Sequence, residues 1–460
     1  MSDKKYCLVL AAGDGTRMKS EKPKVLCEVL FYPMLGWVLD AAESAGAEKT
    51  GVVVGAHKEM VEAYLKSRGE YPTFTQSERK GTGHAVMMAR ELIEEAAREK
   101  ADIMVACGDA PFIDKETIEN SYRCHKEQGN DVTVVSAILD NPFGYGRIIK
   151  EKGQFISITE QKDCNDEQKA VKEINSGIYW FKAEKLGGLL DSLTCNNAAK
   201  EYYLTDTVAL AEKKGVYTAE NSNVVLGANS RSQLSALNKT ARDNVLSKLM
   251  DNGVDIPLTD GIIIGKDVVI GADTVILPGT IIKGKTVIGK NCEIGPNSYI
   301  ENCTIGNEVV LDNVHAYDTE IDDDVKAGPF VHLRPGTKLH SKIRIGDFVE
   351  VKNSEIGVAT CIAHLTYVGD SDVGKDVNFG CGCVTANYDG INKFRTVIGD
   401  HCFIGCNTNL VPPVRIGNNA STGAGSTITR DVPENALAVE RAETKIIENW
   451  EKNFKRKRKA

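Results

Sequence analysis

The chain has 460 residues, of which 42% are hydrophobic and 26% are charged, and its 56 basic and 64 acidic side chains give a net charge of −8. This length exceeds what one hydrophobic core usually organises, so at least two domains are expected. The acidic balance argues against nucleic acid as a partner, because nucleic-acid binding needs a basic surface.

The apolar runs and the cysteines indicate a cytoplasmic protein with no membrane insertion. No apolar run approaches the roughly 18 residues of a membrane span, and the start of the chain lacks a signal-peptide core. The 13 cysteines are scattered without a CxxC pair, which predicts free thiols and neither a disulfide framework nor a structural zinc site. The 42 glycines, beside only 6% aromatic residues, predict many tight turns.

The first half alternates short apolar runs with longer amphipathic stretches. Strands are predicted at Tyr6–Ala11, Thr50–Val54, Ile103–Ala106 and Val132–Ala137. Helices are predicted at Gly36–Ser44, Lys58–Ser67, Gly83–Arg98 and Lys115–Gln128. This alternation predicts an α/β Rossmann-like domain with a mostly parallel sheet, which binds ligands at the carboxyl ends of its strands. We place this domain at residues 1–229 and a linker helix at 230–251, where apolar residues have helical spacing.

A glycine-containing loop follows the first predicted strand. Gly13 and Gly15 allow backbone N–H groups to approach a polyphosphate, and Arg17 can bind phosphate oxygens in a bidentate manner. Lys24 adds a second cation one short loop later. The combination predicts a polyphosphate site at the end of this strand.

After residue 251 the sequence acquires a period of six. Isoleucine occupies positions 264, 270, 276, 282, 288, 294 and 300, and the spacing returns in 327–351 and 398–428 after one or two slips. Such a repeat is typical of a parallel β-helix, whose left-handed form has coils of about 18 residues. We expect on the order of ten coils over residues 252–437, with a C-terminal tail at 438–460 that carries a basic run. A structural spacer or an oligomerisation rod would show the same repeat.

Polar residues interrupt the repeat from Ala386 to Arg395. Such an excursion projects as a loop, and insertions tend to lie on the binding face of a solenoid. Arg334 and Lys352 are 18 residues apart, so we expect them on successive coils, and His364 lies two faces beyond Lys352. These residues could bind a substrate that carries both a phosphate group and an amine. Cations that include Lys393 would bind its phosphate, and His364 would take a proton from the amine as it attacks a thioester.

Two features carry a family resemblance. The segments Leu10–Met18 and Pro23–Leu26 resemble the opening of the sugar-nucleotide pyrophosphorylases. With the hexapeptide solenoid behind them, the chain resembles the bacterial family that combines UDP-N-acetylglucosamine pyrophosphorylase with glucosamine-1-phosphate N-acetyltransferase. The resemblance implies acetylation of glucosamine 1-phosphate by acetyl-CoA and transfer of UMP from UTP to N-acetylglucosamine 1-phosphate with release of pyrophosphate. It also implies supply of peptidoglycan and other cell-envelope precursors, and a homotrimer with acetyl-CoA bound between subunits.

In the first half, the resemblance gives Arg17 and Lys24 catalytic roles. They offset charge while the sugar phosphate attacks the α-phosphorus of UTP in line. Asp109 and Asn229 are implied to hold Mg²⁺. The implied contacts to UTP and UDP-N-acetylglucosamine are Leu10, Ala11, Ala12, Gly13, Lys24, Gln76, Gly81, Thr82, Gly146, Glu160, Asn175 and Asn229. Among them, the resemblance makes Gln76, Gly81 and Thr82 part of the segment that reads uracil, and Gly146, Glu160 and Asn175 sugar contacts. Asp14 and Cys107 stand where the family usually has Lys and Tyr.

In the second half, the resemblance makes His364 the catalytic base. The implied contacts to glucosamine 1-phosphate are Arg334, Lys352, Tyr367, Asn378 and Lys393. The implied contacts to acetyl-CoA are Cys381, Asn387, Tyr388, Cys406, Ala424 and Arg441. Cys381 and Cys406 replace the Ala and Ser that are usual there, and both side chains are small enough to preserve the groove.

Two other functions stay open at this point. One is a pyrophosphorylase for a different sugar nucleotide whose solenoid only regulates or oligomerises, and His364 with the inserted loop weighs against it. The other is a non-catalytic scaffold, against which the phosphate and metal residues of the first half weigh. A zinc site of the carbonic-anhydrase type is disfavoured, because close paired spacing is lacking among His315, His332, His340, His364 and His401.

Overall fold

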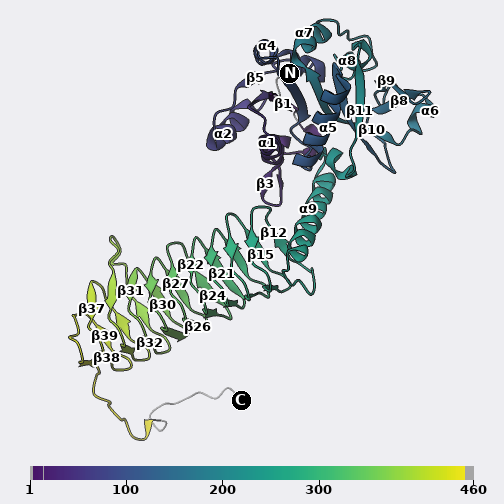
Figure 1. Cartoon of the computed structure of the whole chain (residues 1–460). Helices are drawn as coiled ribbons and strands as arrows, with labels where there is room; N and C mark the ends of the chain where they lie inside the picture. The colour runs from purple at the N-terminus through teal and green to yellow at the C-terminus, as the bar shows by residue number, and fades with distance from the viewer. Residues whose placement is uncertain (1–3, 14, 451–460) are drawn as a thin grey trace, which may run out of the picture. The chain divides into compact units, whose positions relative to one another are not determined.

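The computed structural model describes residues 4–13 and 15–450 (Figure 1). The chain divides into two compact units, and the boundary falls between Ala241 and Arg242, within helix α9 (Arg231–Asp251). Asp14 and the basic run at 455–459 lie outside the described residues. None of the helices in the described part of the chain combines the length and the apolar character needed to cross a membrane.

A mixed sheet forms the middle of the first unit. Its strand order is β11-β7-β10-β6-β1-β4-β5. The bounds are Lys5–Ala11 (β1), Lys49–Val54 (β4), Thr73–Thr75 (β5), Asp102–Cys107 (β6), Val132–Ile138 (β7), Glu173–Lys182 (β10) and Lys214–Thr218 (β11). β10 runs antiparallel to β6 and β7, whereas the other neighbours pair in parallel. The four predicted strands are therefore present, and the sheet is mostly parallel as expected.

Helices cover both faces of this sheet. One face packs against α1 (Met34–Ser44), α2 (Lys58–Arg68) and α5 (Lys115–Gln128). The other face packs against α3 (Thr82–Met87), α4 (Arg90–Arg98) and α7 (Ala183–Asp191). The shorter elements are η1 (Thr16–Met18), η2 (Lys24–Leu26), β2 (Glu28–Val29), β3 (Tyr32–Pro33), β8 (Arg147–Glu151), β9 (Gln154–Thr159), α6 (Asp166–Lys169), α8 (Asp206–Leu210) and η3 (Ser222–Val225).

The prediction of one helix over Gly83–Arg98 was wrong, because the segment forms α3 and α4. The chain turns at Met88 and Ala89, where the N–H of Ala89 donates to Val86 O over 3.0 Å. The turn lets α3 and α4 each bury apolar side chains in the same core, including Val86 and Leu92.

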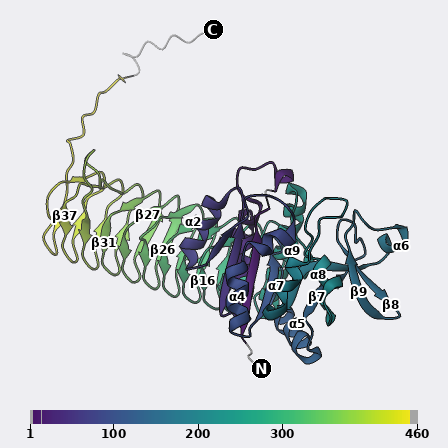
Figure 2. The same ribbon diagram turned by 90° about the horizontal axis from the view of Figure 1, so that it is seen from above.

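The second unit is a parallel β-helix made of three sheets. The sheets have ten, nine and ten strands, and each strand pairs with the strand one coil later. Their first strands are β12 (Ile263–Ile264), β13 (Val269–Ile270) and β14 (Val275–Ile276), and their last are β39 (Thr427–Ile428), β37 (Val414–Ile416) and β40 (Leu437–Ala438). Figure 2 shows strands following one another along this unit, among them β16 (Val287–Ile288), β26 (Arg344–Asp347), β27 (Glu350–Lys352) and β31 (Ser371–Val373). The solenoid prediction and its coil number are confirmed.

The predicted isoleucine anchors fill the axis of the solenoid. All seven are buried and belong to one continuous core that extends to Val432. The repeat slips more often than the sequence suggested. Paired positions lie 18 residues apart at Ile263 and Ile281, 16 apart at Tyr299 and His315, and 17 apart at Val314 and Val331. A coil can lose a corner residue while its anchors still stack, and a strict period of six does not anticipate this.

Candidate active sites

The first candidate site lies where the parallel strands β1, β4 and β6 end. The loop after β1 packs closely there: a Cβ at Gly55, after β4, would lie 2.4 Å from Ala12 O. Gly15 has a φ of +60°, and a Cβ on it would lie 2.6 Å from Lys24 Cβ. Glycine at both positions therefore allows the loop to lie between the end of β4 and η2, with Lys24 beside it. Gly13 has open space around it, so its backbone can be approached.

Lys24 brings the two predicted metal ligands together. Its Nζ forms an ion pair with Asp109 Oδ2 and donates a hydrogen bond to Asn229 Oδ1 over 2.9 Å. Asp109 follows β6 and Asn229 follows η3, and a Cβ at Gly227 would lie 3.0 Å from Asp109 O. The side chains of Lys24 and Asp109 are 13% and 20% exposed, so the pair is shielded from water yet reachable.

Asp109 and Asn229 fit a hard divalent cation. Their side-chain oxygens already share one cation, the ammonium of Lys24, and oxygen is the donor that Mg²⁺ and Ca²⁺ prefer. Within the described residues, no group of three or more His, Cys, Asp or Glu side chains could hold a metal. A cation here would therefore take further oxygen ligands from the substrate, as Mg²⁺ commonly does from phosphates.

The predicted uracil-reading residues lie beside one another. Gln76 is 8% exposed, and its Nε2 donates to Gly81 O over 3.1 Å. Thr82 Oγ1, at the start of α3, accepts a hydrogen bond of 3.1 Å from the N–H of Leu204. Thr205 Oγ1 in turn donates to Glu160 Oε1 over 3.2 Å. The segment around Leu204 therefore connects the predicted base contacts with the predicted sugar contacts.

The predicted sugar contacts Gly146, Glu160 and Asn175 converge. The N–H of Asn175 donates to Gly146 O over 2.9 Å, and a Cβ at Gly146 would lie 3.5 Å from Glu160 Oε2. Asn175 Nδ2 donates to the hydroxyl of Tyr179 over 2.6 Å, which fixes the direction of the amide. A side chain at position 146 would enter this space, so glycine keeps it open.

Arg17 and Cys107 complete the first site. Arg17 lies on η1 with its side chain exposed, so it can reach a bound anion from the solvent side. Cys107 ends β6, and a Cβ at Gly177 would lie 3.0 Å from its Sγ. Burial raises the pKa of Cys107 to about 12, so its thiol is neutral.

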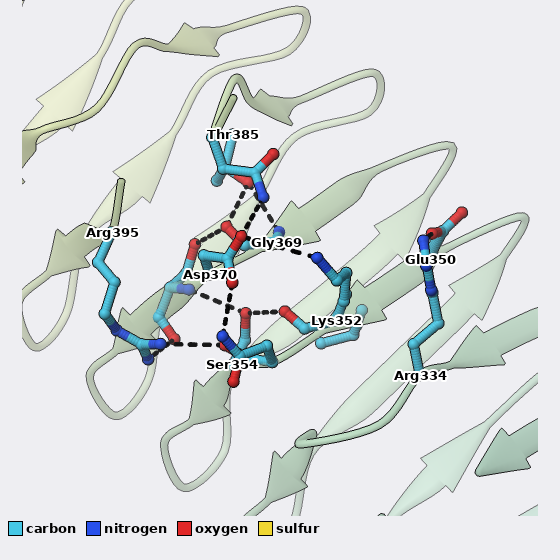
Figure 3. Close-up of polar contacts among 12 residues, drawn as sticks. Arg334, Glu350, Lys352, Ser354, Gly369, Asp370, Thr385 and Arg395 are labelled. Atoms are coloured by element: carbon cyan, nitrogen blue, oxygen red, sulfur yellow. Dashed lines mark hydrogen bonds and ion pairs between the residues drawn. The ribbon is translucent and has the colours of Figure 1, made fainter. Parts of the chain in front are cut away.

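The second candidate site begins with cations stacked on successive coils. Leu333, at the end of β24 (Val331–Leu333), pairs with Val351 of β27, and this places Arg334 next to Lys352 along the solenoid (Figure 3). Arg334 Nη1 donates to Glu350 Oε1 over 2.8 Å. The predicted stacking of Arg334 and Lys352 is confirmed.

The inserted loop brings Lys393 to Lys352. Residues Tyr388 and Lys393 form an antiparallel bridge within the loop, and the N–H of Phe394 donates to Asn387 O over 3.0 Å. The neighbouring Lys393 and burial lower the pKa of Lys352. A cluster of cations that disfavour one another's charge is suited to bind an anion such as phosphate.

Tyr367 lies in β30 (Tyr367–Gly369), the next strand of the same sheet. Lys352 pairs with Gly369, and a Cβ on Gly369 would lie 2.4 Å from the hydroxyl of Tyr367. The ring therefore lies over Gly369, beside the cations. Asn378 starts β32 (Asn378–Phe379) on another sheet and pairs with Cys361.

His364 ends β29 (Cys361–His364) and pairs with Asp347 one coil earlier. Its Nδ1 lies 3.9 Å from Asp347 Oδ2, and its side chain is 60% exposed. Because Nδ1 faces this carboxylate, Nε2 is the ring nitrogen that is left to face a substrate.

Predicted acetyl-CoA contacts form a line that starts at His364. His364 O accepts from Gly382 N–H over 3.4 Å, and Cys381 O accepts from Asn407 N–H over 2.7 Å. Cys406 O accepts from Gly425 N–H over 2.8 Å, so Cys381, Cys406 and Ala424 follow His364 on successive coils. Arg441 Nη2 would lie 3.1 Å from a Cβ at Gly423, next to Ala424.

The structure places this line and the cation cluster at different corners. His364 precedes β30, whereas Gly369, beside Lys352, ends it, so the strand separates the two groups. Asn387 and the 58% exposed Tyr388 lie with the cations and the loop, apart from the other predicted acetyl-CoA contacts.

Sequence reasoning missed two acidic residues of the second site, Asp347 and Asp370. Asp347 faces His364, and Asp370 Oδ2 lies 3.9 Å from Lys352 Nζ. Asp347 precedes His364 by 17 residues and Asp370 follows Lys352 by 18, so each lies one coil from a predicted residue. Counting one coil from each predicted residue would have pointed to both.

Models of known families match both units. Residues 7–152 match the MobA-like NTP transferase domain. Residues 395–430 match the bacterial transferase hexapeptide (six repeats), and residues 261–283 and 285–313 match the hexapeptide repeat of succinyl-transferase. The fold is an α/β nucleotidyltransferase domain followed by a left-handed parallel β-helix.

Curated relatives are similar over nearly the whole chain. The relative from Desulfitobacterium hafniense (strain Y51) is 44% identical over 453 residues, which cover 98% of this chain and 99% of the relative. The relative from Fervidobacterium nodosum is 47% identical over 445 residues, covering 97% and 96%. The relative from Heliobacterium modesticaldum is 46% identical over 452 residues, covering 97% and 98%. Each is named "Bifunctional protein GlmU".

Proposed function

The chain belongs to the bifunctional GlmU family, and from this premise we propose how the residues of its two sites act. It is a bifunctional enzyme of UDP-N-acetylglucosamine synthesis. The solenoid acetylates glucosamine 1-phosphate with acetyl-CoA, and the N-terminal domain transfers UMP from UTP to N-acetylglucosamine 1-phosphate with release of pyrophosphate. The product supplies peptidoglycan and other cell-envelope precursors.

In our proposal, Lys24, Asp109 and Asn229 form the centre of the nucleotidyl-transfer site. The observation that supports this is the convergence of one ammonium and two oxygen donors at the carboxyl ends of the strands. Bound Mg²⁺, held by Asp109 and Asn229, would supply neutralisation of phosphate charge. Lys24 moves from these oxygens to the phosphates, and Arg17 approaches them from η1.

The proposed reaction needs no general base. The phosphate oxygen of the sugar is already ionised, and it attacks the α-phosphorus of UTP in line while pyrophosphate leaves. Gln76, Gly81 and Thr82 bind uracil. Gly146, Glu160 and Asn175 bind the sugar, and the open space at Gly146 admits it.

In the proposed acetyl transfer, His364 is the general base. With Nδ1 directed at Asp347, its Nε2 takes a proton from the amine as the amine attacks the thioester carbonyl, and Asp347 stabilises the imidazolium that forms. The phosphate is held by Arg334, Lys352 and Lys393.

Further proposed contacts surround these groups. Tyr367 and Asn378 contact the sugar. The acetyl-CoA contacts are Cys381, Asn387, Tyr388, Cys406, Ala424 and Arg441. The line from His364 to Arg441 supports a path for the extended pantetheine arm along one corner of the solenoid.

We further propose a cytoplasmic homotrimer with acetyl-CoA bound between subunits. Association is supported by exposed apolar side chains on the solenoid, among them Phe330 and Phe348, whose rings stack at 5.2 Å between centroids. It would also explain why His364 and the cations of one chain lie at different corners, since a neighbouring subunit can complete the site. We propose neither nucleic acid as a partner nor insertion into a membrane.

Asp109→Ala in the full-length chain tests the nucleotidyl-transfer site. The variant should lose pyrophosphate release from UTP, N-acetylglucosamine 1-phosphate and Mg²⁺, and should keep thiol release from acetyl-CoA and glucosamine 1-phosphate. Asp114→Ala, which removes only the N-cap of α5, is the control and should retain both activities. Pyrophosphate release unchanged in Asp109→Ala would overturn the assignment.

A further inference from the structure

Asp370 is a buried carboxylate beside the cations of the solenoid site (Figure 3). It is 4% exposed and lies at the corner between β30 and β31. A buried carboxylate is costly unless its oxygens are hydrogen-bonded and its charge is paired. At Asp370 both conditions are met, and the partners come from different segments of the site.

Two side-chain amides hold the carboxylate of Asp370. Asn353 Nδ2, one coil earlier, donates to Oδ1 over 2.5 Å, and Asn387 Nδ2, one coil later, donates to Oδ2. Asn387 is itself only 7% exposed. The carboxylate therefore joins three successive coils at a common corner.

The backbone of Asp370 also forms hydrogen bonds at this corner of the solenoid. Its N–H donates to Lys352 O over 2.9 Å, and its C=O accepts from the N–H of Thr396 over 3.1 Å. Asn387 precedes Tyr388 and Lys393, and Thr396 follows them, so side chain and backbone of Asp370 hold the two ends of the inserted loop.

Charge completes the arrangement at Asp370. Burial would raise the pKa of this carboxyl, but the hydrogen bonds from Asn353 and Asn387 and the ammonium groups of Lys352 and Lys393 outweigh burial and hold the pKa below its usual value. The carboxylate is therefore ionised beside the cation cluster.

Lys352 lies near both positively and negatively charged side chains. Lys393, burial and Arg334 lower its pKa, whereas Asp370 raises it. Arg334 is itself paired with Glu350 over 2.8 Å. Among these charged groups, Asp370 is the one whose attraction favours the protonated form of Lys352.

We propose that Asp370 is a positioning residue for phosphate binding, which fixes the loop that carries Lys393 and places a negative charge beside Lys352 so that the two lysines can lie together. This inference rests on the proposed acetylation of glucosamine 1-phosphate. Without the carboxylate, Lys352, Lys393 and Arg334 repel one another in the free enzyme, and the two ends of the loop lose a common anchor. With it, the cations are assembled before the phosphate arrives, so less binding free energy goes into ordering them.

Asp370→Asn in the full-length chain is the test, with Asp376→Asn as its matched control. The two aspartates have φ values of +48° and +54°, which asparagine tolerates, so neither substitution strains the backbone. Asp376 lies at another corner of the solenoid, where it pairs with His401 over 3.0 Å.

Asp370→Asn should raise the KM for glucosamine 1-phosphate about tenfold and change kcat less than about threefold, because the lost contact serves phosphate binding. Inhibition by inorganic phosphate should weaken by the same factor. The rise of this KM with pH should begin at lower pH than in the wild type, because Lys352 loses the anion that favours its protonated form. A purely structural residue would lower thermal stability without moving this pH dependence.

A KM and a pH profile of Asp370→Asn that match those of the wild type and Asp376→Asn would overturn the inference. Where Asp370→Asn fails to fold, Asn353→Gly decides. Glycine at position 353 tolerates the φ of +43° and leaves the carboxylate of Asp370 in place, but it removes one amide donor to that carboxylate. The KM for glucosamine 1-phosphate should therefore rise about threefold, and an unchanged KM would count against the inference. Absence of acetyl transfer in the wild type would instead overturn the proposed function and this inference with it.

Discussion

Lys24 donates a hydrogen bond to Asn229 over 2.9 Å, although the two residues lie 205 positions apart in the chain. The same ammonium pairs with Asp109, so it occupies the point to which both oxygen donors are directed. If Asp109 and Asn229 hold the metal as proposed, this cation and a metal ion would compete for the same oxygens in the absence of nucleotide. Phosphates that attract Lys24 would release Asp109 and Asn229, which couples nucleotide binding to metal binding.

Lys24→Met should strengthen the binding of Mn²⁺ to the nucleotide-free protein about fivefold or more, because the competing ammonium is gone. The same variant should lose at least about a hundredfold in pyrophosphate release, because the phosphates lose a cation. Titration of Mn²⁺ by calorimetry and a pyrophosphate assay measure the two effects.

Lys22→Met is the matched control for this prediction. Lys22 forms an exposed ion pair with Glu28 over 2.7 Å, so its loss should change neither Mn²⁺ affinity nor pyrophosphate release. Metal affinity that stays equal or weakens in Lys24→Met would show that the ammonium does not compete with the metal.

Ile288→Ala should destabilise the solenoid by about 2–4 kcal/mol, because the side chain is buried in the axial core and its removal leaves a cavity. Val287→Ala removes the exposed neighbour on the same strand and should change stability by less than about 0.5 kcal/mol. Denaturant unfolding followed through loss of acetyl transfer reports on this unit. Equal effects of the two substitutions would contradict the inward direction of the anchors.

His340 should make the stability of the solenoid depend on pH. Its Nε2 lies 2.8 Å from Glu355 Oε1 and its Nδ1 lies 2.9 Å from Asp322 Oδ2, and these hydrogen bonds raise its pKa. Because the folded pKa exceeds the unfolded value of about 6.5, the stabilisation is fully present below about pH 6.5 and is lost as pH rises through the folded pKa.

The thermal midpoint of His340→Gln should therefore fall below that of the wild type in mildly acidic buffer, and the difference should shrink as the pH rises. In a Glu355→Gln background the same substitution should have a smaller effect, since one partner is already neutral. A difference that grows with rising pH would contradict the assigned direction of the pKa.

Sequence patterns succeeded where burial is uniform along an element. Tyr6–Ala11 and Val132–Ala137 were placed within one residue because both strands are almost wholly buried. β10 escaped prediction because Asn175, Ser176 and Gly177 interrupt its apolar run, and its register shifts between Asn175 and Ile178. Because β10 carries predicted sugar contacts, it lacks the continuous apolar run from which a buried strand is predicted.

The two sites differ in how much of their geometry can be predicted from residue spacing alone. In the solenoid, the coil length places Arg334 next to Lys352 without any further information, and the same count would have found Asp370. In the α/β unit, the meeting of Lys24 with Asn229 depends on the path of the whole chain, which local periodicity does not contain. The family resemblance placed Lys24, Asp109 and Asn229 in one site, but it did not predict the hydrogen bond of Lys24 to Asn229 or its ion pair with Asp109.

Acetyl transfer by His364→Ala tests the central claim of two separate activities most directly. Thiol release from acetyl-CoA with glucosamine 1-phosphate and pyrophosphate release from UTP are measured on the same preparations of wild type and variant. Thiol release should fall at least about a hundredfold because the proton acceptor is gone, while pyrophosphate release stays at the wild-type level because His364 belongs to the other unit. Thiol release undiminished in His364→Ala, or no thiol release by the wild type, would contradict the account.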